Sequence, residues 1–160
     1  MTIRYASQKD EFRCGPYALL NALKWAGWNY SERRHKKYLT KLLHCEDGTP
    51  PIDMFLGLIK LQNKFPTVIY DKEVTARKLN KHLKSGGGAI VNIHYYKRDK
   101  QEWNGHWVFL EKAYKGRYKA INYGRRGTVS LVKRRRLIRE IYNSIKIDDH
   151  VSCFLLEKYK

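Results

Sequence analysis

Cys14 stands where a cysteine can act as a nucleophile, at the start of a stretch whose composition predicts a buried helix. Between Pro16 and Ala26 only Asn21 and Lys24 are strongly polar, which is typical of a helix enclosed by its own domain. Pro16 suits a first helical turn, because its missing N–H needs no partner there. The Cys14 thiol would then lie at the positive end of the helix dipole, where the thiolate is favoured. The pattern therefore predicts a nucleophilic thiolate.

A cysteine nucleophile needs a general base, and His106 is the best placed of the six histidines. Residues 103–105 read as a turn and residues 107–110 as a strand, so His106 is expected to open a strand, where a side chain can face a cleft. His94, which ends another apolar run, is its one serious rival. The other four lie in basic or loop-like segments: His35, His44, His82 and His150.

Asn122 is the candidate for the third group of such a site, which holds the ring of the base in a fixed orientation. It lies on a predicted return strand over residues 118–123, after a turn at Lys115-Gly116. His106 and Asn122 are therefore expected on the two arms of one hairpin.

The length of the turn decides whether the two side chains share a face, because side chains alternate along a strand. A two-residue turn places Phe109 opposite Asn122 and directs His106 to the other face. A three-residue turn over 114–116 places Val108 opposite Asn122, with His106 as its diagonal neighbour on the same face. A catalytic pair thus requires an odd turn or a bulge.

Four short motifs together resemble the papain-like cysteine peptidases, and most closely their bacteriocin-processing branch, the C39-like peptidases. They are Gln8 six residues before the cysteine, Cys14-Gly15-Pro16 opening an apolar helix, Gly105-His106 before an apolar strand, and Ile121-Asn122-Tyr123 on the next strand. The resemblance runs from about Gln8 to the final strand. It implies a papain-like fold with Cys14 as nucleophile, His106 as general base and acid, Asn122 as orienter, and Gln8 as oxyanion-hole donor.

The chain departs from this family in two respects. C39-like proteins usually carry Asp where this chain has Asn122, although papain itself uses Asn. Family members fused to export transporters have transmembrane segments, and no run here approaches the ~18 apolar residues of a membrane span. Substrate identity does not carry over from the resemblance.

The order of the predicted elements favours an α+β fold in one domain over residues 1–160, with the helices packed to one side of an antiparallel sheet. In this arrangement an N-terminal helical part, including the nucleophile helix, packs on a C-terminal sheet. Further helices are expected over residues 32–44, 50–62, 75–84 and 137–145, and strands over 67–70, 89–95, 107–110, 118–123, 128–132 and 151–156. Residues 97–104 are expected to form a polar connection, and Gly86 to Gly88 to end a helix.

The cysteine count and the N-terminus favour a reducing compartment. Cys14, Cys45 and Cys153 cannot all pair within the chain, and residues 1–6 lack the apolar core of a signal peptide. We therefore expect a cytoplasmic protein with thiols. No cofactor is required by a thiol hydrolase, and the adjacent pair His44-Cys45 lacks the spaced partners of a metal site.

The net charge of +18 over 160 residues predicts a partner that carries negative charge. For a peptidase this means a peptide or protein substrate, with acidic segments. The alternative is a basic nucleic-acid-associated or virion-type protein that keeps the papain-like fold while its activity is dispensable or lost. Release of ubiquitin-like tails, acyl transfer and deamidation of glutamine share the first half-reaction of a peptidase, and the sequence does not separate them. The oligomeric state also stays open.

Overall fold

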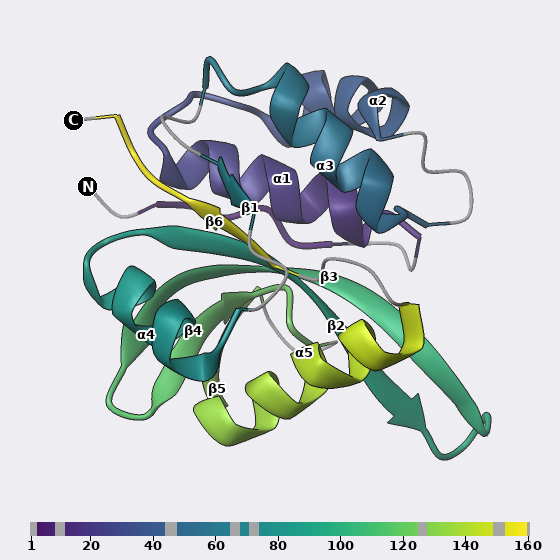
Figure 1. Cartoon of the computed structure of the whole chain (residues 1–160). Helices are drawn as coiled ribbons and strands as arrows, with labels where there is room; N and C mark the ends of the chain where they lie inside the picture. Colours follow the sequence, from purple (N-terminus) through teal and green to yellow (C-terminus); the bar gives the residue numbers. More distant parts are fainter. Residues whose placement is uncertain are drawn as a thin grey trace.

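An antiparallel sheet between two layers of helices is the core of the molecule (Figure 1). The computed structural model describes residues 3–8, 12–43, 48–64, 68–70, 74–124, 128–148 and 153–159. Within these ranges the sheet has six strands in the order β1-β6-β2-β3-β4-β5. Their bounds are β1 Val68–Tyr70, β2 Gly88–Lys97, β3 Glu102–Tyr114, β4 Arg117–Ile121, β5 Val129–Lys133 and β6 Cys153–Leu156.

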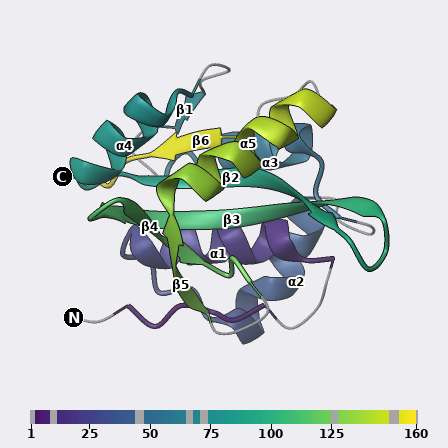
Figure 2. The same cartoon turned by 90° about the horizontal axis from the view of Figure 1, so that it is seen from below.

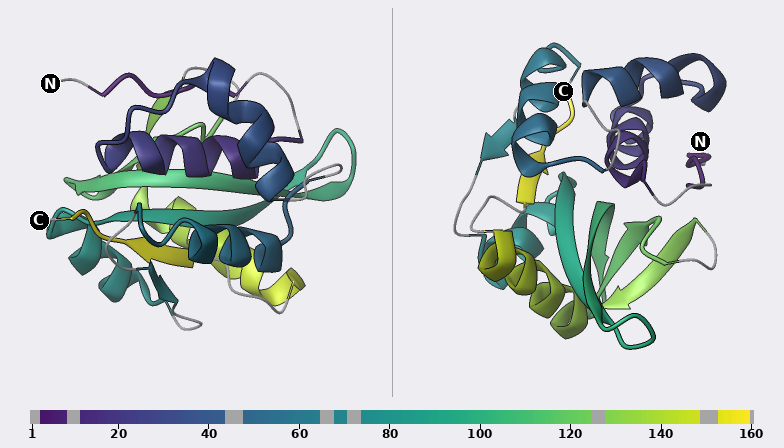
Figure 3. Two further views of the ribbon diagram at one scale, coloured as in Figure 1. Left: turned by 90° about the horizontal axis from the view of Figure 1, so that it is seen from above. Right: turned by 90° about the vertical axis from the view of Figure 1, so that its right-hand side faces the viewer.

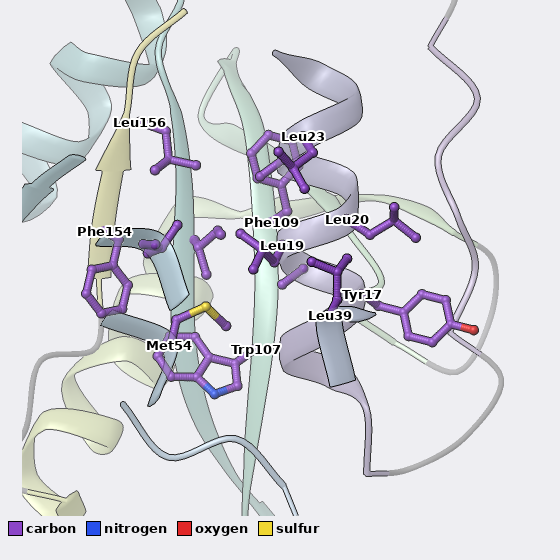
Figure 4. Packing of buried hydrophobic residues seen from close by; sticks show 14 of the residues in the cluster. Tyr17, Leu19, Leu20, Leu23, Leu39, Met54, Trp107, Phe109, Phe154 and Leu156 are labelled. Atoms are coloured by element: carbon purple, nitrogen blue, oxygen red, sulfur yellow. The ribbon is translucent and has the colours of Figure 1, made fainter. Parts of the chain in front are cut away.

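Three helices cover one face of the sheet: α1 (Cys14–Trp25), α2 (Glu32–Leu42) and α3 (Pro51–Lys60). Helix α1 lies directly against β3, and its leucines pack on Phe109 and Trp107 with Phe154 and Leu156 of β6 (Figure 4). Burial on nearly all sides of α1 explains why its sequence is apolar throughout rather than along one stripe.

The opposite face carries α4 (Ala76–Lys84) and α5 (Arg134–Asp148), so the expectation that all helices lie on one side is wrong. Successive residues of β3 point to opposite faces of the sheet. Phe109 belongs to the core under α1, while Val108 and Leu110 belong to a second core on the other face. That second core includes Leu79 of α4 and Leu137 of α5. Figure 2 shows α4 and α5 on the face of the sheet opposite α1. Chain order could not reveal this, because two helices that interrupt a run of strands can cross either face.

The predicted starts of α2, α3 and α4 are confirmed, whereas α5 begins at Arg134, before the predicted start at residue 137, and α3 ends at Lys60, before the predicted end at residue 62. Ser31 and Thr75 each accept a hydrogen bond from the backbone N–H three residues later, at 3.3 and 3.2 Å. Pro51 occupies the first position of α3. The chain leaves α4 through Gly86, whose φ of +93° lies in the region that glycine adopts most readily. None of the helices in the described ranges is long and apolar enough to cross a membrane.

The segment expected as a polar connection, residues 97–104, is a connection only over residues 98–101, because residues 97 and 102–104 are strand. Strands β2 and β3 pair as far as Lys97 opposite Glu102, so residues 103–105 are not a turn and His106 lies inside β3 rather than at its start. Tyr96 and Trp103 lie opposite each other on the two strands. Their rings are exposed, and the ring centroids are 5.5 Å apart. The polarity of this segment reflects exposure beyond the helices, not the absence of a strand.

The β3–β4 hairpin combines a two-residue turn with a bulge. Lys115 and Gly116 both have positive φ, at 38° and 76°, as a tight hairpin turn requires. Lys112 pairs with Lys119 and Leu110 with Ala120, so Glu111 is an extra residue in β3. The bulge shifts the pairing so that Phe109 lies opposite Ile121, and Val108 is next in line with Asn122. The requirement for an odd turn or a bulge is therefore met by the bulge.

Candidate active site

Cys14 is the first residue of α1 and is only 7% exposed. The first turn of this helix contains no acidic residue, and Arg13 at the N-cap makes no side-chain capping bond. Unpaired N–H groups at the start of a helix and the helix dipole both favour an anion. The fold therefore places Cys14 where its sequence pattern predicts it.

Thr49 connects the start of α1 to β3. A Cβ atom built on Gly15 would lie 2.2 Å from Oγ1 of Thr49, so only glycine fits at this approach. The indole N–H of Trp107 donates to the main-chain carbonyl of Thr49 at 2.7 Å. Gly15 follows Cys14 and Trp107 follows His106 along the chain, so this contact ties the neighbourhoods of the two predicted catalytic residues together.

The ring of His106 is fixed by a main-chain group. Its Nε2 lies 2.6 Å from the carbonyl oxygen of Asn122. A carbonyl oxygen only accepts, so Nε2 carries the hydrogen and the acceptor lone pair of the neutral ring is on Nδ1. Burial lowers the pKa of His106 below its ordinary value of 6.5, and the charge of Lys97 lowers it further, against the opposing effect of the Asn122 carbonyl. The ring therefore favours the neutral form, which is the form of a general base.

The carboxamide of Asn122 contacts residues 6 and 8 and not the ring of His106, which it was expected to orient. Its Nδ2 donates to the carbonyl of Ala6 at 2.9 Å, and its Oδ1 accepts from the backbone N–H of Gln8 at 3.2 Å. The backbone of Asn122 is left-handed, with φ of 58°, and its N–H donates to the carbonyl of Thr128 at 2.7 Å. Asn is among the few residues that adopt this conformation readily. The imidazole is thus held by the carbonyl of Asn122 and not by its side chain.

Residues 3–8, here called the N-terminal strap, join α1 to Asn122. Asn21 of α1 accepts from the N–H of Ala6 at 2.8 Å and donates to its carbonyl at 3.1 Å. The Ala6 carbonyl therefore receives the amides of both Asn21 and Asn122. Sequence reasoning did not assign a role to Asn21, although a strongly polar residue in an otherwise apolar helix is a signal that a buried partner exists.

A second buried group holds the chain where it leaves Asn122. The hydroxyl of Tyr123 donates to Glu140 at 2.6 Å, and Arg136 donates to the other oxygen of the same carboxylate at 3.0 Å. Glu140 is 5% exposed. Burial, and then the bond to Glu140, raise the pKa of the Tyr123 hydroxyl well above its usual range. This group anchors the residue after Asn122 to α5, so it stabilises the backbone that carries the carbonyl.

The remaining predicted candidates lie apart from this group or outside the described residues. His94 packs its ring on Gly105, where an added Cβ would lie 2.7 Å from Nε2. His82 contacts the carbonyls of Gly88 and Leu156. Cys153 is a buried thiol in the core on the opposite face of the sheet. His44, Cys45 and His150 fall outside the described ranges. Within those ranges no three His, Cys, Asp or Glu residues gather to hold a metal ion.

Hydrogen bonds therefore join three of the four predicted site residues, Gln8, His106 and Asn122. The fourth, Cys14, is linked to them through Gly15, Thr49 and Trp107. A neutral imidazole with a fixed tautomer can take a proton from a thiol and return it to a leaving group.

Two solved structures share this fold along almost its whole length. One is the peptidase domain of Streptococcus ComA, a bifunctional ABC transporter involved in quorum sensing, with TM-score 0.66, 18% identity, and coverage of 99% of this chain and 100% of that one. The other is a C39-like peptidase from Bacillus anthracis, with TM-score 0.66, 12% identity, and coverage of 99% and 96%. No protein-family model and no curated protein matches the sequence. The chain thus has the papain-like fold of C39 peptidase domains, which confirms the predicted fold and resemblance.

Proposed function

We propose that this protein is a cysteine peptidase that cleaves peptide or isopeptide bonds through Cys14, His106 and Asn122. The fold of C39 peptidase domains is the premise. The observation that carries the proposal is the partly buried imidazole of His106, whose Nε2 lies against the Asn122 carbonyl, so that the tautomer is that of a base. This contact leaves the lone pair on Nδ1, the nitrogen that would accept the thiol proton.

The reaction proceeds through an acyl-enzyme. Nδ1 of His106 takes the thiol proton while the sulfur of Cys14 attacks the carbonyl carbon of the substrate. The C–N bond breaks as His106 returns the proton to the leaving amine, and a thioester remains. Water, activated by the same nitrogen, hydrolyses the thioester and releases the second product. The backbone N–H of Cys14 and the side-chain amide of Gln8 stabilise the oxyanion in both steps.

Asn122 acts in this scheme as a positioning residue. Its carbonyl fixes the plane and the tautomer of His106, and it adds no full negative charge beside the ring. The imidazolium that forms during attack is therefore stabilised less than it would be beside a carboxylate. We expect His106 to be charged only transiently. The resting pair is then a thiol and a neutral imidazole, although the start of α1 on its own favours the thiolate.

The alternative function, that of a basic nucleic-acid-associated protein without activity, does not require the thiol of Cys14. A binding protein keeps its affinity for nucleic acid when the thiol is removed, and that affinity falls steeply with salt. A cysteine peptidase loses its activity when the thiol is removed. Release of ubiquitin-like tails, acyl transfer and deamidation all require Cys14 as nucleophile. These reactions can be distinguished only by their products.

The decisive experiment digests a peptide library with the wild type and with Cys14→Ala, and identifies new termini by mass spectrometry. Cys153→Ala is the matched control, because it removes a thiol on the other face of the sheet. We expect cleavage by the wild type and by Cys153→Ala, and none by Cys14→Ala. A complementary assay measures alkylation by iodoacetamide, which should favour Cys14 and lose this preference in His106→Ala but not in His94→Ala. Equal alkylation of the three cysteines in the folded wild type would contradict the proposal.

A further inference from the structure

A long cationic segment without acidic residues includes the β4–β5 edge of the sheet. Between Lys112 and Arg139 the sequence has eleven Lys and Arg residues and no Asp or Glu. This segment contains β4, β5 and the first turns of α5. β5 is the outermost strand on this side, and no strand in the described ranges pairs with its outer edge (Figure 3, right).

One face of this edge combines positive charge with apolar side chains. Arg117 lies opposite Lys133, Lys119 opposite Leu131, and Ile121 opposite Val129. Residues directly opposite each other in an antiparallel pair share a face. Val129 and Leu131 are 47% and 49% exposed, and Arg117 and Lys133 are also exposed. An edge strand offers a row of unpaired main-chain N–H and C=O groups to another chain, and the two half-exposed apolar side chains add contact area beside them.

This surface starts at the candidate active site. The backbone N–H of Asn122, whose carbonyl holds His106, donates to the carbonyl of Thr128, the residue that precedes β5. Strand β5 therefore runs outward from the point where the imidazole is anchored.

We infer that the β5 edge, with Arg117, Lys133, Val129 and Leu131, is a docking site for an extended acidic segment of the substrate. The inference rests on the proposed peptidase function and adds the class of substrate and the place where it binds. The segment pairs with the outer main-chain groups of β5, as peptides do when they add a strand to a sheet. Its Glu or Asp side chains meet Arg117 and Lys133, and its apolar side chains cover Val129 and Leu131.

The observations favour a peptide over a nucleic acid. An open strand edge offers alternating N–H and C=O groups, which a peptide backbone completes and a sugar-phosphate backbone does not. The two apolar side chains on the same face gain nothing from phosphate. Because the edge begins at a site that would act on a peptide carbonyl, a peptide also reaches the chemistry directly.

The test measures the binding of a short fluorescent peptide to the Cys14→Ala protein by fluorescence anisotropy. Every second residue of the peptide is Val or Glu and the others are Ser, so that the Val and Glu side chains share one face of the added strand. The docking variant carries Arg117→Glu and Lys133→Glu. The matched control carries Arg77→Glu and Lys81→Glu, two exposed cations of α4 on the other face of the sheet, so the change in net charge is the same. We expect affinity to fall about tenfold or more in the docking variant and less than about twofold in the control. Equal losses would show that only total charge matters and would overturn the docking site.

Two further probes test the nature of the contact. The same peptide with alternate backbone nitrogens methylated cannot complete the strand pairing, and we expect it to bind at least about tenfold more weakly. Unchanged affinity would overturn pairing along β5. A single-stranded oligonucleotide that binds more tightly than the acidic peptide, and displaces it, would assign this surface to nucleic acid instead.

The failure of the docking site and the failure of the peptidase function are distinguishable. Iodoacetamide is small and neutral, so its preference for Cys14 should be the same in the wild type and in the Arg117→Glu, Lys133→Glu variant. If that preference is absent from the wild type, the peptidase function fails whatever the anisotropy shows. If it is present but the docking variant binds the peptide normally, only the docking site fails.

Discussion

At position 122 the main chain and the side chain perform separate tasks. The carbonyl holds the imidazole of His106, while the carboxamide joins the N-terminal strap by donating to Ala6 and accepting from Gln8. Only an amide can do both, because Ala6 offers an acceptor and Gln8 a donor. Asn122 thus meets a requirement that an ionised Asp would not meet.

Asn122→Asp should therefore destabilise the protein at neutral pH, by about 1 to 3 kcal/mol, because the carboxylate faces the Ala6 carbonyl without a donor. The folded state raises the pKa of this new carboxyl group, so protonation as the pH falls restores a donor and removes the penalty. Urea unfolding at neutral and acidic pH measures the effect relative to the wild type. Asn122→Gly, which keeps the left-handed backbone but lacks a carboxyl group, should show a deficit that does not change with pH. An Asp variant as stable as the wild type at neutral pH would contradict the assigned hydrogen bonds.

The lowered pKa of His106 makes stability depend on pH in a defined window. Above its ordinary value of 6.5 the ring is neutral in both the folded and the unfolded chain, and it contributes no pH dependence. Below 6.5 the unfolded chain takes up a proton that the folded protein does not, so the free energy of unfolding falls until the pH reaches the folded pKa. Urea unfolding between about pH 7.5 and pH 5 should show this loss, and His106→Gln should reduce it. His35→Gln is the control that should retain it, and an identical slope in His106→Gln would refute the pKa direction.

The residue types of the candidate site could be predicted from the sequence, but the atoms that make the contacts could not. Gly15, Pro16 and the apolar run mark Cys14 as the start of a buried helix, and the structure has that helix. The sequence does not tell whether the main-chain carbonyl or the carboxamide of Asn122 contacts His106. Every residue has a main-chain carbonyl, and its direction depends on φ and ψ. The partner of Asn21 was equally hidden, because it is the main chain of a residue fifteen positions earlier.

Among the elements, the start of α1 is positioned by close packing of Gly15 on Thr49. The Thr49 carbonyl also receives the indole N–H of Trp107, whose ring packs beside Phe154 with centroids 5.9 Å apart. Figure 4 shows Trp107 between α1 and β6. A shift of Thr49 therefore changes the spacing between the helix that carries Cys14 and the strand that carries His106.

Gly15→Ala should lower the free energy of unfolding by about 1 to 3 kcal/mol, because the new methyl group overlaps the Thr49 side chain. It should also slow alkylation of Cys14. Thr49→Gly removes the overlapping atoms, so the double variant should recover part of the loss, which a thermal or urea unfolding series on all four proteins would reveal. Additive losses in the double variant would mean that Gly15 is required for another reason.

The topology of the hairpin was predictable in part. Counting residues between His106 and Asn122 showed that the two share a face only with an odd turn or a bulge, and the structure has the bulge at Glu111. The extra residue, Glu111, pairs with Lys119. Burial, and then the charge of Glu111, raise the pKa of Tyr5 in the strap, so Glu111 also lies close to the strap. The face that α4 and α5 occupy was not predictable, because amphipathic helices fit either side of a sheet whose two faces are both apolar.

For the whole molecule, the dominant feature is the excess of positive charge on a folded body. Acidic residues in the described ranges serve specific contacts, as Glu140 does with Tyr123 and Arg136 and Glu32 with the hydroxyl of Tyr17. Most of the cations are therefore not neutralised by the chain itself, and they repel one another. The assignment of residues 1–160 to one domain and to the cytoplasm stays a prediction.

Added salt should stabilise this protein. Screening weakens repulsion between exposed cations more than it weakens the partly buried pairs, so the free energy of unfolding should rise between about 0.05 and 0.5 M NaCl. Urea unfolding at several salt concentrations measures the change. Arg117→Glu with Lys133→Glu lowers the net charge and should reduce the gain. Stability that falls with salt would mean that attractive pairs outweigh the repulsion.

The main-chain anchor of His106 affects how similar sites are found in other genomes. A search that demands an acidic or amide side chain after the last strand of this hairpin tests an atom that does not touch the ring here. Residues that tolerate a left-handed backbone, chiefly Gly, Asn and Asp, could all present the same carbonyl. A homologue with glycine at this position should therefore not be classified as inactive because of the glycine alone.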